Sequence, residues 1–208
     1  MSDAFAMIDR VIKAIAQTAI ANEEYFCELD SVVGDGDFGF SLARGFEKVL
    51  QDYDTFDRTD PGTFLKKVGL VLTSRCGGTS GPLWGTGFLR AGMAIGDKSR
   101  LSATDVVTML RASFDGIQAR GKAELGDKTL LDALGPFIDS FAAGIVQGDA
   151  VQALQAAALD SQKAAEETSG WIARRGRAAY TGERSIGSPD AGAMAVALII
   201  REVAKELN

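Results

Sequence analysis

The sequence Asp30-Ser31-Val32-Val33-Gly34-Asp35-Gly36-Asp37-Phe38-Gly39 places three carboxylates close together, separated by glycines. One helix would not bring Asp35 onto the face shared by Asp30 and Asp37, whereas a loop containing glycine can turn sharply, because glycine reaches positive φ at no steric cost. Three carboxylates directed at one spot repel each other unless a cation lies between them. Oxygen ligands of this kind suit Mg²⁺ or Ca²⁺, and Mg²⁺ is commonly bound together with a phosphate. The stretch therefore predicts a metal-bridged phosphate site in a loop, and the alternative interpretation is a solvated polar turn.

Composition limits the function classes to which this chain can belong. Its 208 residues are 46% hydrophobic, enough for one domain with a sizeable core, which we expect to span residues 1–208. The net charge is −6 and there is no basic tract, so nucleic acid is not expected as a partner. The sequence has no histidine, which excludes Ser-His and Cys-His nucleophile pairs and the usual zinc sites. Acid–base chemistry would have to use carboxylates, lysine, tyrosine or metal-bound water.

The distribution of apolar residues and cysteines predicts a cytoplasmic protein. The longest apolar run, Ala193 to Ile200, is far shorter than the roughly 20 residues that cross a bilayer, so no membrane association is expected. Acidic residues come early and no positive start precedes an apolar run, so no signal peptide is expected. Cys27 and Cys76 are too few for a disulfide framework.

The spacing of apolar residues predicts an all-α protein. Between residues 3 and 26, for example, Met7, Ile8, Val11 and Ile15 follow the three-four spacing of an amphipathic helix. No run alternates convincingly with a period of two, so no strand is predicted. The eight predicted helices cover residues 3–26, 41–50, 61–75, 82–95, 102–120, 130–145, 149–168 and 190–207. Because the connections are short, neighbouring helices should be antiparallel and form an up-and-down bundle.

Alternate connections of this predicted bundle differ in composition. The connections after the first, third, fifth and seventh helices carry glycines and functional polar groups, whereas the other connections carry fewer of them. In an up-and-down bundle, alternate connections lie at the same end. We therefore expect carboxylates, backbone N–H groups and arginines to converge at one end of the bundle, from residues 30–39, 77–81, 121–129 and 174–190.

Two of these segments are candidates for phosphate binding. Residues Gly77-Gly-Thr-Ser-Gly81 precede a predicted helix, whose N-terminal N–H groups and dipole favour an anion. They lack the Gly-Lys-Ser/Thr of a Walker A loop, and the alternative is an ordinary helix cap with a tight turn. Arg177 can bind a phosphate through two donors, or it can be a surface arginine paired with Glu183 or Asp190.

Four motifs stand out in chain order: Gly34-Asp-Gly-Asp-Phe-Gly39, Gly77-Gly-Thr-Ser-Gly-Pro-Leu-Trp-Gly85, Gly126-Asp-Lys-Thr-Leu-Leu-Asp-Ala-Leu134 and Gly176-Arg-Ala-Ala-Tyr-Thr-Gly-Glu-Arg-Ser-Ile-Gly187. They resemble those of the nucleotide-binding L subunits of dihydroxyacetone kinases, and the resemblance covers essentially the whole chain. It implies an eight-helix antiparallel barrel with a nucleotide and two Mg²⁺ ions at one end.

The resemblance also implies a set of site residues. Asp30, Asp35 and Asp37 match the metal ligands of the family, and with Arg177 they are the residues expected to serve catalysis. Phosphoryl transfer depends on positioning and charge neutralisation, which removes the need for a histidine in this chain. The implied nucleotide contacts are Phe38, Gly39, Phe40, Ser41, Gly78, Thr79, Ser80, Gly121, Leu130, Arg177, Asp190, Ala191 and Gly192.

By this resemblance, the function is shared between subunits. The chain would hold ADP or ATP, and a phosphoryl group would pass to dihydroxyacetone on a separate K subunit. In the phosphoenolpyruvate-dependent branch of the family, a phosphocarrier subunit of the sugar phosphotransferase system rephosphorylates the bound ADP. In the ATP-dependent branch, the L domain is usually fused to the K domain and uses free ATP. The chain stands alone, which favours the multi-subunit arrangement, and a homodimer stays open.

Two departures from the family pattern leave the substrate and the class of function open. Phe38 stands where the family usually has histidine, and Gly187-Ser-Pro-Asp-Ala-Gly192 replaces a Gly-His-Gln-Asp-Pro-Gly segment. These changes are compatible with a kinase subunit for a four-carbon sugar. A protein of another class, a nucleotide-sensing interaction protein, would bind ADP–Mg²⁺ and report its state to a partner without turnover. A Ca²⁺-binding module is disfavoured, because the loop lacks the EF-hand ligand pattern.

Overall fold

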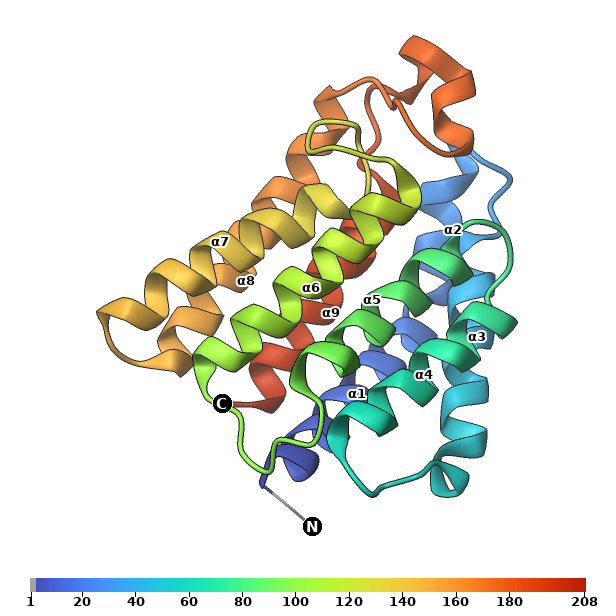
Figure 1. The fold of residues 1–208 in the computed structure, drawn as a ribbon. Helices are drawn as coiled ribbons and strands as arrows, with labels where there is room; N and C mark the ends of the chain where they lie inside the picture. Colours follow the sequence, from blue (N-terminus) through green and yellow to red (C-terminus); the bar gives the residue numbers. More distant parts are fainter. Residues whose placement is uncertain (1–2) are drawn as a thin grey trace.

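The computed structural model describes residues 3–208, and the all-α prediction is confirmed (Figure 1). These described residues contain no strand. The α-helices are α1 Asp3–Ala21, α2 Glu23–Ser31, α3 Phe38–Asp52, α4 Pro61–Arg75, α5 Ser80–Ile95, α6 Ala103–Gly121, α7 Leu131–Gln147, α8 Ala150–Glu167 and α9 Ala191–Glu206. The short 3₁₀ helices are η1 Tyr53–Thr55, η2 Thr168–Gly170 and η3 Arg177–Ser185.

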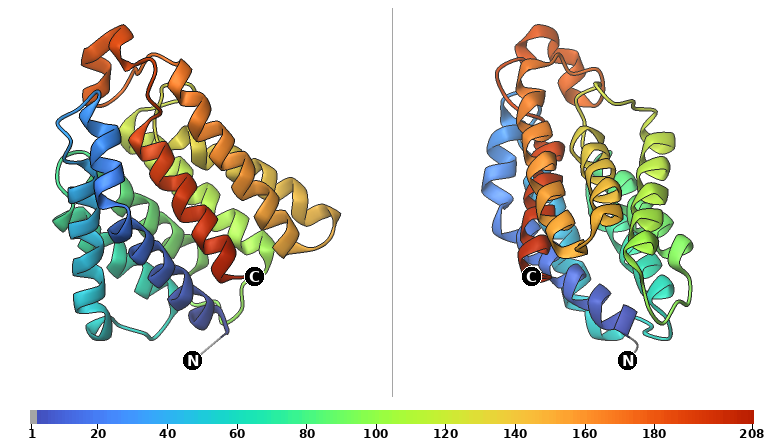
Figure 2. Two further views of the ribbon diagram at one scale, coloured as in Figure 1. Left: turned by 180° about the vertical axis from the view of Figure 1, so that it is seen from behind. Right: turned by 90° about the vertical axis from the view of Figure 1, so that its left-hand side faces the viewer.

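Eight of the helices form a closed barrel. Every consecutive pair from α3 to α9 is in contact, and α1 packs against both α3 and α9, which closes the ring. Figure 2 shows α1 and α9 side by side from behind. The remaining helix, α2, continues from α1 and packs against α3 and α9. The predicted antiparallel barrel is thus present, with one helix more than the eight predicted over residues 3–208.

The extra helix arises because the first predicted helix is broken. We expected one helix over residues 3–26, but α1 ends at Ala21 and α2 begins at Glu23. At the break, the carbonyl of Thr18 accepts hydrogen bonds from both the backbone N–H and the side-chain amide of Asn22. Helix α2 then extends to Ser31. The expectation that all three carboxylates lie in a loop is therefore wrong for Asp30, which belongs to the last turn of α2.

Two helix starts follow the chemistry of the sequence closely. Asp60 accepts a hydrogen bond from the Thr63 N–H at 2.7 Å, and Pro61 occupies the first position of α4, where a missing N–H costs nothing. Ser102 and Asp105 form a complete capping box at the start of α6. Caps of this kind each stabilise a helix by about 0.5–2 kcal/mol.

The barrel is filled by apolar side chains from every α-helix. Phe26, Phe46 and Phe64 are fully buried, and burying one such side chain contributes about 1.5–3 kcal/mol. Helices α4 and α5 approach closely at glycines, where a Cβ on Gly69 would lie 2.6 Å from the carbonyl oxygen of Gly85. An apolar cavity of about 580 Å³ remains inside the barrel, and its lining does not suit a charged ligand.

The ends of the barrel differ in character. The α2–α3, α4–α5 and α6–α7 connections and residues 168–190 lie at one end, and the chain termini lie toward the other (Figure 1). This arrangement agrees with the predicted alternation of the connections. Within residues 3–208, no helix combines the length and the apolar character that crossing a bilayer requires.

Candidate functional site

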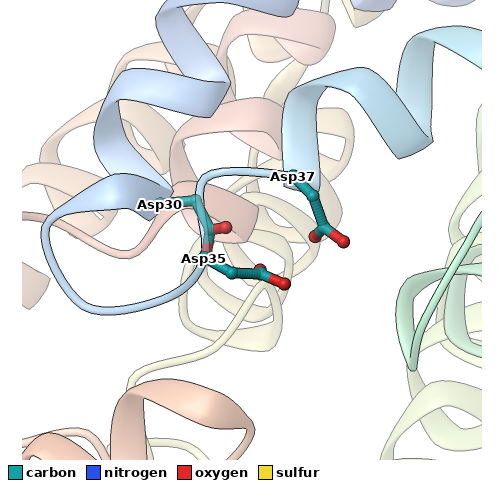
Figure 3. A group of neighbouring side chains, drawn as sticks. All are labelled: Asp30, Asp35 and Asp37. Atoms are coloured by element: carbon teal, nitrogen blue, oxygen red, sulfur yellow. The ribbon is translucent and has the colours of Figure 1, made fainter.

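The three carboxylates meet around the turn between α2 and α3 (Figure 3). One oxygen each from Asp30, Asp35 and Asp37 lies within 4.8 Å of the others. Gly36 has a φ of +73°, which favours glycine, and a Cβ on Gly34 would displace the Asp30 carboxylate from its position. The carboxylates thus converge as predicted, although Asp30 projects from a helix. Three oxygen ligands at this spacing fit a hard divalent cation.

Arg177 reaches the same carboxylates from the far end of the sequence. It opens η3, and its guanidinium forms an ion pair with Asp35. The same Nη1 lies 3.9 Å from a carboxylate oxygen of Asp37. The alternative pairing of Arg177 with Glu183 or Asp190 is therefore not what the structure shows. A cationic group at this position offsets part of the repulsion between the carboxylates.

A polar cavity of about 500 Å³ opens beside these groups. All four segments that were expected to converge contribute to its wall, which confirms the argument from alternating connections. The predicted site residues that line it are Asp30, Asp35, Asp37, Phe38, Gly78, Thr79, Ser80, Gly121, Leu130, Arg177, Asp190, Ala191 and Gly192.

Three predicted nucleotide contacts do not line this cavity. Gly39 packs against α2, where an added Cβ would lie 2.8 Å from the backbone nitrogen of Cys27. Phe40 is 53% exposed and lies under the guanidinium of Arg44. Ser41 is buried, and its hydroxyl lies beside Gly77. Their expected role in nucleotide binding stays a prediction.

Phe38, the departure from the family histidine, has a packing role. Its ring lies 6.1 Å from that of Phe26, measured between centroids, and it packs against the hydrophobic core at the first residue of α3. It also lines the cavity. An aromatic ring here gives this wall of the cavity an apolar surface.

The start of α5 faces the cavity with free backbone donors. The first N–H groups of a helix have no acceptor within the helix, and here Thr79, at the cap position, makes no side-chain capping hydrogen bond. Gly78 has a φ of +59°, which turns the chain into the helix. Thr79 and Ser80 both line the cavity. Pro82 carries no N–H, so the N–H groups of Ser80 and Gly81, together with the helix dipole, are the donors suited to an anion such as phosphate.

The α6–α7 connection supplies a buried lysine that we did not predict as a site residue. Lys128 is 2% exposed, and its ammonium donates to the carbonyls of Trp171, Ser185 and Ser188. Burial lowers the pKa of Lys128, and the nearby Asp190 opposes that shift. The residue lies within a motif quoted above, but a sequence does not reveal that a lysine is buried.

Two acids next to this lysine have raised pKa values. Burial raises the pKa of Asp190 to about 7, and repulsion from Asp132 adds to the shift. Hydrogen bonds from the Ala193 and Gly192 N–H groups and the charge of Lys128 act in the opposite direction. Burial also raises the pKa of Asp132, despite the N–H groups that donate to its carboxylate. Asp190 caps α9 through its carboxyl group and also lines the cavity.

Comparison with known proteins places the chain in a family. The family model described as the DAK2 domain matches residues 32–205. The chain therefore belongs to the DAK2 domain family.

Its relatives include separate subunits and longer kinases. It is 41% identical over 182 residues to the ADP-binding subunit DhaL of the PEP-dependent dihydroxyacetone kinase from Escherichia coli, covering 87% of each chain. It is 33% identical over 202 residues to the L-erythrulose kinase of Pectobacterium atrosepticum, covering 95% of this chain but 34% of that one.

A solved structure extends the comparison to the fold. The dihydroxyacetone kinase from C. freundii in complex with AMP-PNP and Mg²⁺ superposes with a TM-score of 0.74 at 26% identity. The match covers 99% of this chain and 34% of that chain, so the present chain spans about a third of that kinase. A barrel of this type is thus found both as a separate subunit and as part of a longer chain.

Proposed function

We propose that this chain is the ADP- or ATP–Mg²⁺-binding subunit of a short-chain ketose kinase of the dihydroxyacetone type. The observation that carries the proposal is the meeting of Asp35, Asp37 and Arg177 beside the polar cavity, in front of the free N–H groups of α5. Carboxylates for a metal, an arginine and a helix N-terminus together provide what a nucleoside polyphosphate needs. The ADP-binding subunit from Escherichia coli, at 41% identity, supports the choice of nucleotide.

The carboxylate cluster fits the proposed Mg²⁺ ions. Asp30 is half-buried, whereas Asp35 and Asp37 are exposed and accessible to a hydrated cation. One or two carboxylates, completed by phosphate and water, are what each Mg²⁺ ion usually takes in proteins. We propose that these three residues hold the metal, with two ions expected. Bound Mg²⁺ would neutralise phosphate charge as the phosphoryl group moves.

The remaining residues of the cavity would bind and orient the nucleotide. The N–H groups at the start of α5 would donate to phosphate oxygens, and Arg177 would bind the terminal phosphate through its paired donors. Phe38 and Leu130 supply apolar walls suited to the nucleoside. No side chain needs to form a covalent intermediate, which agrees with a chain that lacks histidine.

The proposed reaction requires partners. The ketose would be held by a separate sugar-binding K subunit that meets the open end of the barrel, because the cavity and the carboxylates lie at that end. If phosphoenolpyruvate is the ultimate donor, a phosphocarrier subunit of the phosphotransferase system would rephosphorylate bound ADP. Phosphoenolpyruvate and its phosphocarrier subunits would have to reach this chain inside the cell, which would place the chain in the cytoplasm. The relative named L-erythrulose kinase makes a four-carbon ketose the second candidate substrate.

A single-turnover experiment tests this proposal. The purified chain is loaded with ATP labelled at the γ-phosphate and with Mg²⁺, then mixed with the dihydroxyacetone-binding subunit of a relative and with dihydroxyacetone or erythrulose. We expect about one labelled sugar phosphate per nucleotide-loaded chain, and none when the partner subunit is omitted. Tight nucleotide binding without transfer to either ketose would contradict the proposal and favour a nucleotide-sensing protein.

A further inference from the structure

The geometry points to Lys128 as a positioning residue that holds Arg177 over the carboxylates. We define the arginine segment as residues 171–188, which include η3. In this inference, the buried ammonium of Lys128 fastens the arginine segment to the α6–α7 connection. It rests on the proposed function, because the role of Arg177 at a nucleotide phosphate depends on that function.

The arginine segment has little hydrophobic packing of its own. Ala173 is its only buried apolar residue. Of its larger apolar side chains, Trp171 is partly buried, whereas Ile172 is 43% exposed, Ile186 is 47% exposed and Tyr180 is 91% exposed. Burial of apolar surface therefore contributes little to its placement. Polar contacts must hold the segment in position.

Lys128 joins the two ends of the arginine segment, which are also linked directly by a hydrogen bond from the Ala173 N–H to the Ser185 hydroxyl oxygen. Its Nζ donates to the carbonyl of Trp171 at 3.1 Å, which lies at the start of the segment. It also donates to the carbonyls of Ser185 at 2.5 Å and Ser188 at 2.7 Å, which lie at the end. Arg177 lies on the stretch of chain between these contacts. One ammonium thus closes the base of the loop that carries the arginine.

The same contacts exclude a direct catalytic role for this lysine. An ammonium group has three N–H donors and no acceptor, and all three donors of Lys128 are used by backbone carbonyls. The side chain is 2% exposed, although the residue lines the cavity. It cannot bind phosphate or move a proton without giving up a buried hydrogen bond, which costs about 1–3 kcal/mol.

The backbone of the same connection supports this assignment. Lys128 has a φ of +63°, a backbone conformation that favours glycine, so a lysine at this position adopts a less favourable backbone conformation. The preceding residue, Asp127, also contacts the arginine segment: its carbonyl accepts from the Arg174 N–H at 3.0 Å and its carboxylate pairs with Arg175 at 2.9 Å. Two successive residues thus hold the segment that carries the arginine.

The chain offers a matched control in Lys122. It is the other non-glycine residue with positive φ among residues 3–208, it lies in the same connection, and it is exposed. Lys128→Met and Lys122→Met therefore remove the same charge from the same backbone conformation. Only the first removes an ammonium from three carbonyls.

Hydrogen exchange of the nucleotide-free protein is the first measurement. We expect Lys128→Met to speed exchange in residues 171–188 by at least about tenfold, because the carbonyls lose their common donor. Exchange in α4 and α5 should stay as in the parent, and Lys122→Met should change neither region. Unchanged exchange in residues 171–188 would overturn the inference. Should Lys128→Met fail to fold, Lys128→Gln, which keeps two donors, serves the same comparison.

A double-mutant cycle on ADP–Mg²⁺ binding is the second measurement. If Lys128 acts through Arg177, Lys128→Met should weaken binding by about tenfold in the parent and by no more than about twofold in Arg177→Ala. Equal losses in both backgrounds would mean that Lys128 acts independently of Arg177 and would overturn the inference. A parent that binds no ADP would instead contradict the proposed function, and the exchange experiment would still decide how the segment is held.

Discussion

Arg177 and Asp35 form an ion pair between η3 and the α2–α3 connection, and the same guanidinium lies 3.9 Å from a carboxylate oxygen of Asp37. These residues are far apart in sequence, and closure of the barrel between α9 and α1 brings their segments together. The pair defines the centre of the proposed site. A phosphate bound here would contact the arginine on one side and a carboxylate-bound metal on the other.

Substitution of Arg177 by methionine should weaken nucleotide binding and leave the fold intact. A hydrogen bond to a charged group contributes about 1.5–3 kcal/mol, which corresponds to a loss of roughly tenfold to a hundredfold in ADP–Mg²⁺ affinity. Titration calorimetry measures the change. Arg184→Met is the control, because Arg184 lies on the same 3₁₀ helix, is exposed and does not line the cavity. Equal losses in both variants would contradict the role given to Arg177.

Neutralising Asp35 should abolish the stabilising effect of Mg²⁺. A ligand that binds only the folded state raises the melting temperature, so Mg²⁺ with ADP should stabilise the parent and have little effect on Asp35→Asn. ADP affinity in Mg²⁺ should fall by at least about tenfold, because even the mutation of a residue that only supports a metal ligand lowers metal affinity by about 10–100-fold. Asp97→Asn, an exposed acid in the α5–α6 connection, should behave as the parent. Thermal melts with and without Mg²⁺ decide between these outcomes.

The contribution of Asp190 to the free energy of unfolding should decrease as the pH rises toward neutrality. Burial raises the pKa of this carboxyl to about 7, above the value of about 4 for an unfolded aspartate. Between these two pKa values the folded state binds the proton at Asp190 more tightly than the unfolded state does. The stabilisation of the folded state by this proton is therefore fully present below about pH 4, and it is lost as the pH rises through about 7. Asp190→Asn mimics the protonated form and can still cap α9. Urea denaturation should find the variant similar to the parent at pH 5 but more stable than it at pH 8.

The close approach of α4 and α5 should not tolerate a methyl group. A Cβ on Gly69 would lie 2.6 Å from the Gly85 carbonyl oxygen and 3.0 Å from the Leu89 nitrogen, both of which are backbone atoms. Overpacking costs about 1–3 kcal/mol, which exceeds the gain of about 0.5–1 kcal/mol from replacing glycine by alanine within a helix. Gly69→Ala should therefore lower the free energy of unfolding. Gly170→Ala, where nothing lies within 4 Å of the added atom, should change it by no more than about 0.5 kcal/mol.

The sequence was sufficient to predict most of the helices because their signals are local, whereas the barrel was expected from the family resemblance. Asp60-Pro61 and the Ser102–Asp105 capping box begin helices at or within one residue of the predicted starts. The break at Asn22 was not predictable in this way, because the residues around it continue an amphipathic pattern. The extension of α2 to Ser31 was likewise not predicted, so Asp30 was expected in the loop.

The site was predictable where its residues are recognisable by type and spacing. Three aspartates among glycines indicated a cation site, and the alternation of connections indicated convergence. Lys128 was missed because its role depends on burial and on the backbone carbonyls of residues far away in sequence. Asp132 was missed because its raised pKa depends on burial. The spacing of residue types does not show which polar side chains are buried by residues distant in sequence.

Equilibrium dialysis of the purified protein against radiolabelled ADP tests the central claim most directly. The measurement is made in Mg²⁺ and in EDTA, with long exchange times so that any nucleotide carried through purification is replaced. We predict about one ADP per chain in Mg²⁺ and almost none in EDTA, because the three carboxylates bind phosphate only through the metal. Equal binding in the two buffers, or no binding in either, would contradict a metal-dependent nucleotide site at Asp30, Asp35 and Asp37.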